Sequence, residues 1–190
     1  MKTWKHPKLG NLKYDDDQVC WIGKCHLPAF KVFKWKSKKW KSKLKKPVGE
    51  FELLFATDDG ATPSTRAAML ATLVVANHEK LASLVAPTLW EDFNGRGPES
   101  GMWWHGDMGQ VEENIRYGDC PKPKGPQDLL SVMRFTRLVI HESVYKYKAP
   151  IGEFTFAALF DEEHGVGILT DGEKIVGTGY AQEASPFELK

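Results

Sequence analysis

The strongest pattern in the chain is a helical repeat of apolar residues that begins after Thr62-Pro63. A threonine followed by proline is typical of a helix start, because proline at the first helical position loses no hydrogen bond. Apolar residues then recur at helical spacing, at Leu70, Leu73, Val74, Leu81, Leu84 and Val85. Only Thr72 is polar within residues 67–76, which predicts a turn buried on most sides. We expect Pro87 to end or kink this helix.

Shorter apolar segments on either side of the helix predict strands. The segments before it are 9–14, 19–27, 29–35 and 49–55, arranged most simply as an antiparallel meander. After it, Pro126 to Met133 is typical of a short helix, and strands are predicted over 134–145, 154–160 and 165–180. The last of these contains Asp171-Gly172, a pair that favours a hairpin turn.

This order of elements predicts an α+β fold. We expect a largely antiparallel β-sheet, with one long and Pro-kinked helix and one or two short helices packed on one face. The chain has 190 residues, a length that suits a single domain over 1–190. Two segments interrupt the pattern and are interpreted as insertions: the Lys-rich segment 36–48 and the irregular, Trp-rich segment 95–124.

The net charge of +1 hides a strong local asymmetry. Residues 31–46 carry nine lysines and no acid, so the rest of the chain is net negative. Lysines interleaved with aromatic residues favour contact with an acidic protein partner or, less well, with nucleic acid, for which no motif is present. The alternative is that the lysines protect exposed strands while the tryptophans pack on the core. The candidate binding residues here are Lys34, Trp35, Lys36, Lys38, Lys39, Trp40 and Lys41.

Segment 95–124 contains a second candidate site. Two indoles, an imidazole and a carboxylate occur together at Trp103, Trp104, His105 and Asp107. If the tryptophans are exposed, they would suit a binding anchor, and the His–Asp pair would suit acid/base chemistry. The alternative is a loop that folds its two tryptophans back over the domain, which requires no function for these residues. The preceding GRGPESG lacks the pattern of a phosphate-binding loop.

A third candidate is the turn predicted at Asp161, Glu162, Glu163, His164 and Gly165. Three carboxylates and an imidazole suit a divalent metal or proton transfer, although the HExxH and EF-hand spacings are absent. An acidic turn in which His164 and Gly165 fix the backbone explains the same residues without chemistry. A metal-assisted hydrolase would need this turn to meet His105 and Asp107 in space.

The remaining composition predicts a cytoplasmic protein without a cofactor. No apolar run approaches the roughly 20 residues of a membrane helix, and the N-terminus lacks an apolar signal core. The three cysteines, Cys20, Cys25 and Cys120, fit neither a disulfide scaffold nor a zinc site and are interpreted as structural thiols.

The C-terminal run LFDEEHGVGILTDGEKIVGTGYA resembles a pattern of uncharacterised bacterial domain families. In these families a strand leads into an Asp-x-Glu-His-Gly turn, a hydrophobic strand and a hairpin. The opening LGNLKYDDDQVCWIGKCHLPAF and the helical stretch from Asp58 to Phe93 are similar to theirs as well. Some such proteins resemble immunity proteins of polymorphic toxin systems. The resemblance implies a toxin-like partner and carries over no catalytic residue.

Together these observations predict a non-enzymatic bacterial binding protein that acts by occluding an acidic partner. The alternatives are the metal-assisted hydrolase built on Asp161 to His164 and a nucleic-acid binder built on the lysines. The sequence leaves the oligomeric state open.

Overall fold

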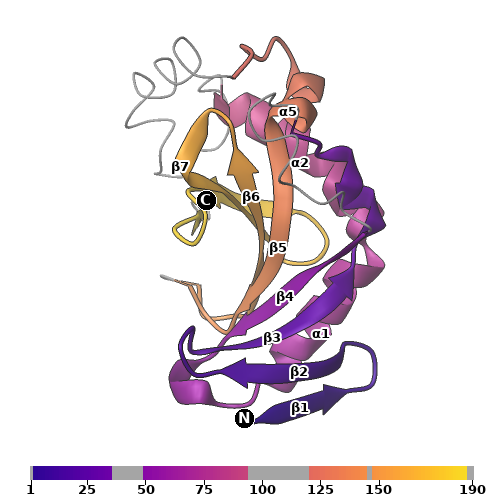
Figure 1. Ribbon diagram of the computed structural model, residues 1–190, viewed down its shortest axis with the longest axis vertical. Coiled ribbons are helices and arrows are strands. Elements are labelled where there is room, and N and C mark those ends of the chain that lie inside the picture. Colours follow the sequence, from indigo (N-terminus) through magenta and orange to yellow (C-terminus); the bar gives the residue numbers. More distant parts are fainter. Residues whose placement is uncertain (1, 36–48, 94–119, 145–146, 188–190) are drawn as a thin grey trace.

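Nine strands form one sheet, and they lie side by side in the order in which they occur in the sequence (Figure 1). The structure is a computed structural model, and it describes residues 2–35, 49–93, 120–144 and 147–187. The strands are β1 (Thr3–His6), β2 (Gly10–Asp15), β3 (Cys20–His26), β4 (Glu50–Ala56), β5 (Met133–His141), β6 (Ile151–Ala158), β7 (Asp161–Thr170), β8 (Ile175–Gly179) and β9 (Ser185–Pro186).

The sheet consists of two antiparallel meanders joined by one parallel pair. Strands β1 to β4 alternate in direction, and so do β5 to β9, but β4 and β5 run parallel, with Leu53 opposite Leu138 and Phe55 opposite Ile140. A parallel pair needs a crossover connection, because the chain must return to the edge at which it started. All of the described α-helices lie within this crossover.

The crossover contains helices α1 (Thr65–Ala76), α2 (His78–Phe93) and α5 (Pro126–Val132). Figure 1 shows α1 and α2 following one another along one side of the sheet. They are separate helices because the backbone at Asn77, with φ −99° and ψ 13°, departs from α-helical geometry after Ala76. The Asn77 side-chain Nδ2 donates to the carbonyl of Gly172 at 2.8 Å, which anchors the break to the β7–β8 turn.

The predicted fold class is therefore wrong. The sheet is mixed, because sequence periodicity does not reveal that β4 and β5 pair in parallel. The expected single long helix is two helices, and the break falls at Asn77 and not at Pro87, which lies inside α2.

The predicted strand over 29–35 is also wrong, since Pro28–Val32 forms a short 3₁₀ helix, η1. This helix directs Phe30 into the core, where its ring centroid lies 4.5 Å from that of Phe135 and 4.6 Å from that of Phe154. A second short 3₁₀ helix, η2 (Asp58–Gly60), precedes α1. The predicted short helix and the hairpin at Asp171-Gly172 are both present.

The main core lies between the helices and one face of the sheet. Helix α1 packs on β5 and β6, while α2 packs on β8, α5 and η1. The inward stripes of α1 and α2 are fully or almost fully buried: Ala67, Ala68, Leu70, Ala71 and Val74 in α1, and Leu81, Ala82, Val85, Ala86 and Leu89 in α2. The outer faces of both helices lie outside this core, so the core does not determine which residue types they carry.

Candidate binding cleft

An open cleft of about 950 Å³ lies beside α1. Four parts of the chain line it: the outer side of α1, the first strand and the turn after it, the segment before β6, and the β7–β8 turn. The lining residues are Trp4, His6, Lys8, Pro63, Thr65, Arg66, Ala68, Met69, Leu70, Thr72, Leu73, Ala76, Tyr147, Ala149, Pro150 and Asp171.

The α1 side of the cleft is an exposed apolar stripe. Met69 is 67% exposed and Leu73 is 36% exposed, and both are among the few large apolar side chains that the described residues leave open. With Ala76 they follow helical spacing, so they form one continuous face. The sequence predicted that this turn would be buried on most sides. Most sides of this turn are buried, and the face with Met69 and Leu73 is the one that is left uncovered.

The cleft also carries unpaired positive charge. Lys8 and Arg66 are exposed, and neither forms an ion pair with a described residue. Arg66 lies in the first turn of α1, where the helix dipole disfavours a cation. Helix stability therefore does not explain its position.

The start of α1 is fixed independently of Arg66. The Ser64 hydroxyl accepts from the Ala67 N–H at 3.1 Å and donates to Glu142 Oε2 at 2.8 Å, while the Ser64 N–H donates to Glu142 Oε1 at 2.8 Å. The Glu142 carboxylate thus supplies the anion that a helix N-terminus favours. Glu142 contacts Ser64 and forms no ion pair with Arg66.

The β1 side of the cleft presents a tryptophan and an oriented imidazole. The Trp4 ring packs edge-on against Phe55, with centroids 5.5 Å apart, and lies 5.4 Å from the His6 ring. His6 Nδ1 accepts from the Lys8 and Leu9 backbone N–H groups at 3.3 and 3.2 Å. In the neutral ring the hydrogen therefore sits on Nε2, which leaves this nitrogen as a donor.

The chemistry of the lining favours binding. Among the described residues that line the cleft, the only carboxylate is Asp171, and no serine or cysteine is present. Apolar surface with a few directed polar groups is typical of a recognition site.

Most of the predicted lysine site lies outside the described residues, namely Lys36, Lys38, Lys39, Trp40 and Lys41. Lys34 is exposed, and its N–H donates to the Leu130 carbonyl at 2.7 Å. Trp35 is half-buried and packs against the core. The Trp-rich site, with Trp103, Trp104, His105 and Asp107, falls wholly outside the described residues.

The Asp161–Gly165 segment begins strand β7. Asp161 is buried, and its Oδ1 accepts from the His164 N–H at 3.0 Å and contacts His164 Nδ1 at 3.1 Å. Gly165 has φ +69°, and a Cβ there would collide with the Phe156 carbonyl. Glu162 and Glu163 are exposed. These contacts fix the backbone beside an irregularity in the β6–β7 pairing.

The described residues give the hydrolase alternative no support. In the part of the chain that the structure describes, no group of three His, Cys, Asp or Glu side chains could hold a metal ion. The three cysteines are free and buried. Burial raises the pKa of the Cys25 thiol to about 12, and burial together with Glu162 raises the pKa of Cys120 to about 12. Burial also raises the pKa of Cys20. Such thiols are poor nucleophiles.

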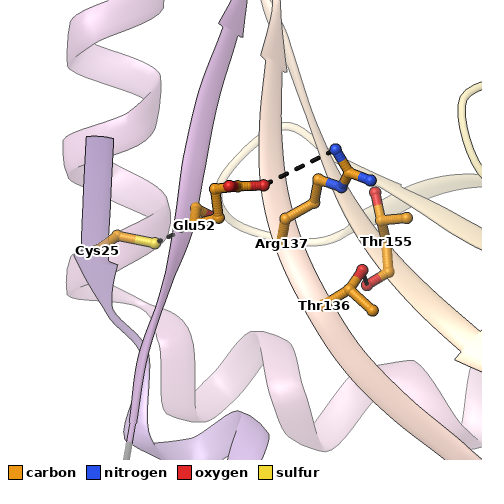
Figure 2. Close-up of polar contacts among 5 residues, drawn as sticks. All are labelled: Cys25, Glu52, Thr136, Arg137 and Thr155. Atoms are coloured by element: carbon orange, nitrogen blue, oxygen red, sulfur yellow. Dashed lines mark hydrogen bonds and ion pairs between the residues drawn. The ribbon is translucent and has the colours of Figure 1, made fainter. Parts of the chain in front are cut away.

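On the sheet face that points away from the helices, some polar side chains pair across neighbouring strands. Figure 2 shows Glu52 on β4 and Arg137 on β5, joined as an ion pair of 3.8 Å between Oε2 and Nη1. It also shows Thr136, whose hydroxyl donates to the Thr155 carbonyl at 2.8 Å where the β5–β6 register shifts.

The same face buries one carboxylate completely. Glu153 is 1% exposed, with Oε2 located 2.7 Å from His141 Nε2 and Oε1 accepting from the Gln182 N–H at 2.6 Å. The sequence did not predict this pair, because His141 and Glu153 meet only through strand register. Both oxygens are occupied, so we interpret the pair as a tether for the C-terminal segment.

Fold and cleft together define a mixed-sheet protein with an open cleft that is lined by apolar and basic side chains. The chain belongs to a family described as a domain of unknown function, DUF6985, whose model matches residues 10–185. This match confirms that the chain is a member of an uncharacterised domain family. No curated protein and no solved structure matches the chain. Among the described residues, no helix is long and apolar enough to span a membrane.

Proposed function

We propose that this protein is a non-enzymatic binding protein that recognises a protein partner through the cleft beside α1. The observation that carries the proposal is the exposure of Met69 and Leu73 on a helix face that lines an open cleft. Exposed apolar side chains that cluster at a cleft are typical of interaction sites, because a partner that covers them removes apolar surface from water.

The residue types in the cleft support a protein partner. Methionine, tryptophan and arginine are enriched where proteins meet, and Met69, Trp4 and Arg66 all line this cleft. Methionine is also flexible and adapts to a partner's shape. A volume of about 950 Å³ is at the upper end of the range for small-molecule pockets, and the cleft is open rather than enclosed.

Binding alone is enough for the finer role that the sequence suggests, toxin neutralisation by occlusion. An immunity-type protein covers the working surface of its partner, so it needs apolar anchors and complementary charge but no chemistry. The basic charge in the cleft and the lysines of residues 31–46 both favour an acidic partner.

Site-directed photo-crosslinking tests the proposal. The variant Met69→Cys places a reactive thiol in the cleft, while the three native thiols are buried and have raised pKa values. Labelled with a thiol-specific photo-crosslinker and illuminated in a lysate of the source organism, it should give one discrete adduct. Adding Leu73→Asp to the same chain should abolish that adduct, because the charge interrupts the apolar face.

The matched control is Ser83→Cys, an exposed position on the outer face of α2. We expect no discrete adduct from it. Equal labelling from both positions, or an adduct that survives Leu73→Asp, would show that α1 is not the recognition surface. The absence of any adduct from Met69→Cys would contradict the proposal as well.

A further inference from the structure

We infer that the cleft accepts an amphipathic helical segment that carries an acidic side chain one turn away from its apolar anchors. This inference rests on the proposed function and specifies the chemistry of the partner. It follows from the spacing of the apolar residues in α1, from the placement of charge in the cleft, and from the absence of a competing ion-pair partner for that charge among the described residues.

The apolar stripe has the geometry of a helix-packing surface. Met69, Leu73 and Ala76 occupy positions i, i+4 and i+7, so they span about 10 Å, or two turns, along α1. Side chains at these positions form the ridges into which a second helix packs. An apolar face with the same i, i+4, i+7 spacing is the usual ligand of such a surface. The small Ala76 allows the closest approach at the C-terminal end.

The charges in the cleft are distributed unevenly along α1. Arg66 lies one turn before Met69, at the N-terminal end of the stripe. Asp171 is at the other end, because its neighbour Gly172 lies against Leu73 and accepts a hydrogen bond from Asn77. Lys8 adds a second exposed cation, and His6 Nε2 adds a donor. A partner carboxylate is therefore favoured at the Arg66 end and disfavoured at the Asp171 end.

Arg66 has no ion-pair partner among the described residues, so a carboxylate would gain a new charge-assisted contact without breaking an existing one. Binding would also relieve the unfavourable placement of a cation in the first helical turn. Charge of this kind mainly selects partners and sets orientation, while the apolar stripe supplies the affinity.

Selection from a peptide library tests the inference with a defined probe. The full chain would be immobilised and exposed to phage-displayed 16-residue peptides on an Ala-rich helical scaffold, with one face randomised. We expect enriched peptides to carry apolar residues at i, i+4 and i+7 and Asp or Glu one turn before or after them. Their affinity should fall at least tenfold with Met69→Asp or with Leu73→Ser. Thermal unfolding would verify that both variants are folded.

The charge assignment is tested by Arg66→Glu, which should shift the enriched residue at the adjacent position from Asp or Glu to Lys or Arg. Lys80→Glu on the outer face of α2 is the matched control and should leave the selected peptides unchanged. Peptides that depend on Met69 but keep the same charge preference with Arg66→Glu would overturn this inference and leave the proposed function intact. Failure to select any Met69-dependent peptide would overturn the inference, and the crosslinking result would then decide the proposed function separately.

Discussion

Helices α1 and α2 follow one another in the chain and bury similar inner faces, but their outer faces differ in kind. The outer face of α2 is polar or charged except for one proline, with Glu79, Lys80, Ser83, Pro87 and Glu91 exposed. The outer face of α1 is apolar except for its first turn, with Arg66, Met69, Leu73 and Ala76 exposed. The two helices share a core, so the inner contacts do not account for this difference.

Apolar residues on these two helices have two different effects. On the inner faces, apolar side chains stabilise the fold because they leave water when the helix packs. On the outer face of α1, Met69 stays mostly in water, and Leu73 is only partly covered, by the turn at Gly172. Their free-energy gain is available only when something covers them, which is why we assign recognition to α1 and solvation to α2.

A matched pair of leucine truncations should give the largest difference between inner and outer faces. Leu81→Ala on the inner face of α2, where the side chain is 0% exposed, should lower the free energy of unfolding by about 2–5 kcal/mol, because it leaves a cavity in the core. Leu73→Ala on the outer face of α1 should cost about 1 kcal/mol or less. Urea unfolding measures both. Equal losses would mean that the α1 face is part of the core.

Alkaline pH should weaken the core that both helices share. Burial raises the pKa of the Cys25 thiol from its ordinary value of 9.0 to about 12, so unfolded chains ionise first. Stability due to this thiol is complete below pH 9 and falls as pH rises toward 12, by about 1.4 kcal/mol per pH unit. Cys25→Ala should reduce the slope of stability against pH in this range. An unchanged slope would mean that Cys25 is accessible to water.

The beginning of α1 should depend on its cap more than on its exposed side chains. Ser64→Ala removes the hydroxyl that bonds both Ala67 and Glu142, and it should cost about 1–2 kcal/mol. The neighbouring Thr65→Ala serves as the control and should change stability by less than about 0.5 kcal/mol. Thermal unfolding of the two variants distinguishes a capped helix start from one held by packing alone.

The smallest effect on stability is expected from changing the outer face of α1 itself. Met69→Gln keeps the length of the side chain and should shift the free energy of unfolding by no more than about 0.5 kcal/mol. The same change should markedly reduce binding of the selected peptides. A large loss of stability would show that Met69 is buried in the working state of the protein, for example by another copy of the chain.

Local sequence patterns predicted many of the elements but not how they join. The Pro126 helix and the Asp171-Gly172 hairpin follow from short-range rules, and both are present. The break at Asn77 depends on a hydrogen bond to Gly172, which is 95 residues away in the sequence. The parallel β4–β5 pair likewise depends on a crossover that periodicity does not encode.

The candidate site was missed because its signal was interpreted as burial. The run AAMLATLVVA contains one polar residue, and such a run is typical either of a buried helix or of a helix with a binding face. Only the arrangement of β1, α1 and the segment before β6 shows that Met69 is uncovered. The Lys-rich and Trp-rich segments, for which the sequence predicted binding, lie largely outside the described residues.

The single parallel pair also has a consequence for the kinetics of folding. Most strand pairings join neighbours in the sequence and close short loops, but β4 ends at Ala56 and β5 begins only at Met133. Bringing these two strands together costs more chain entropy than forming any one hairpin, and non-local pairings slow folding. We therefore expect the joining of the two meanders to limit the refolding rate. Relaxation complete within about 10 μs after a laser temperature jump, the timescale of a hairpin, would contradict this expectation.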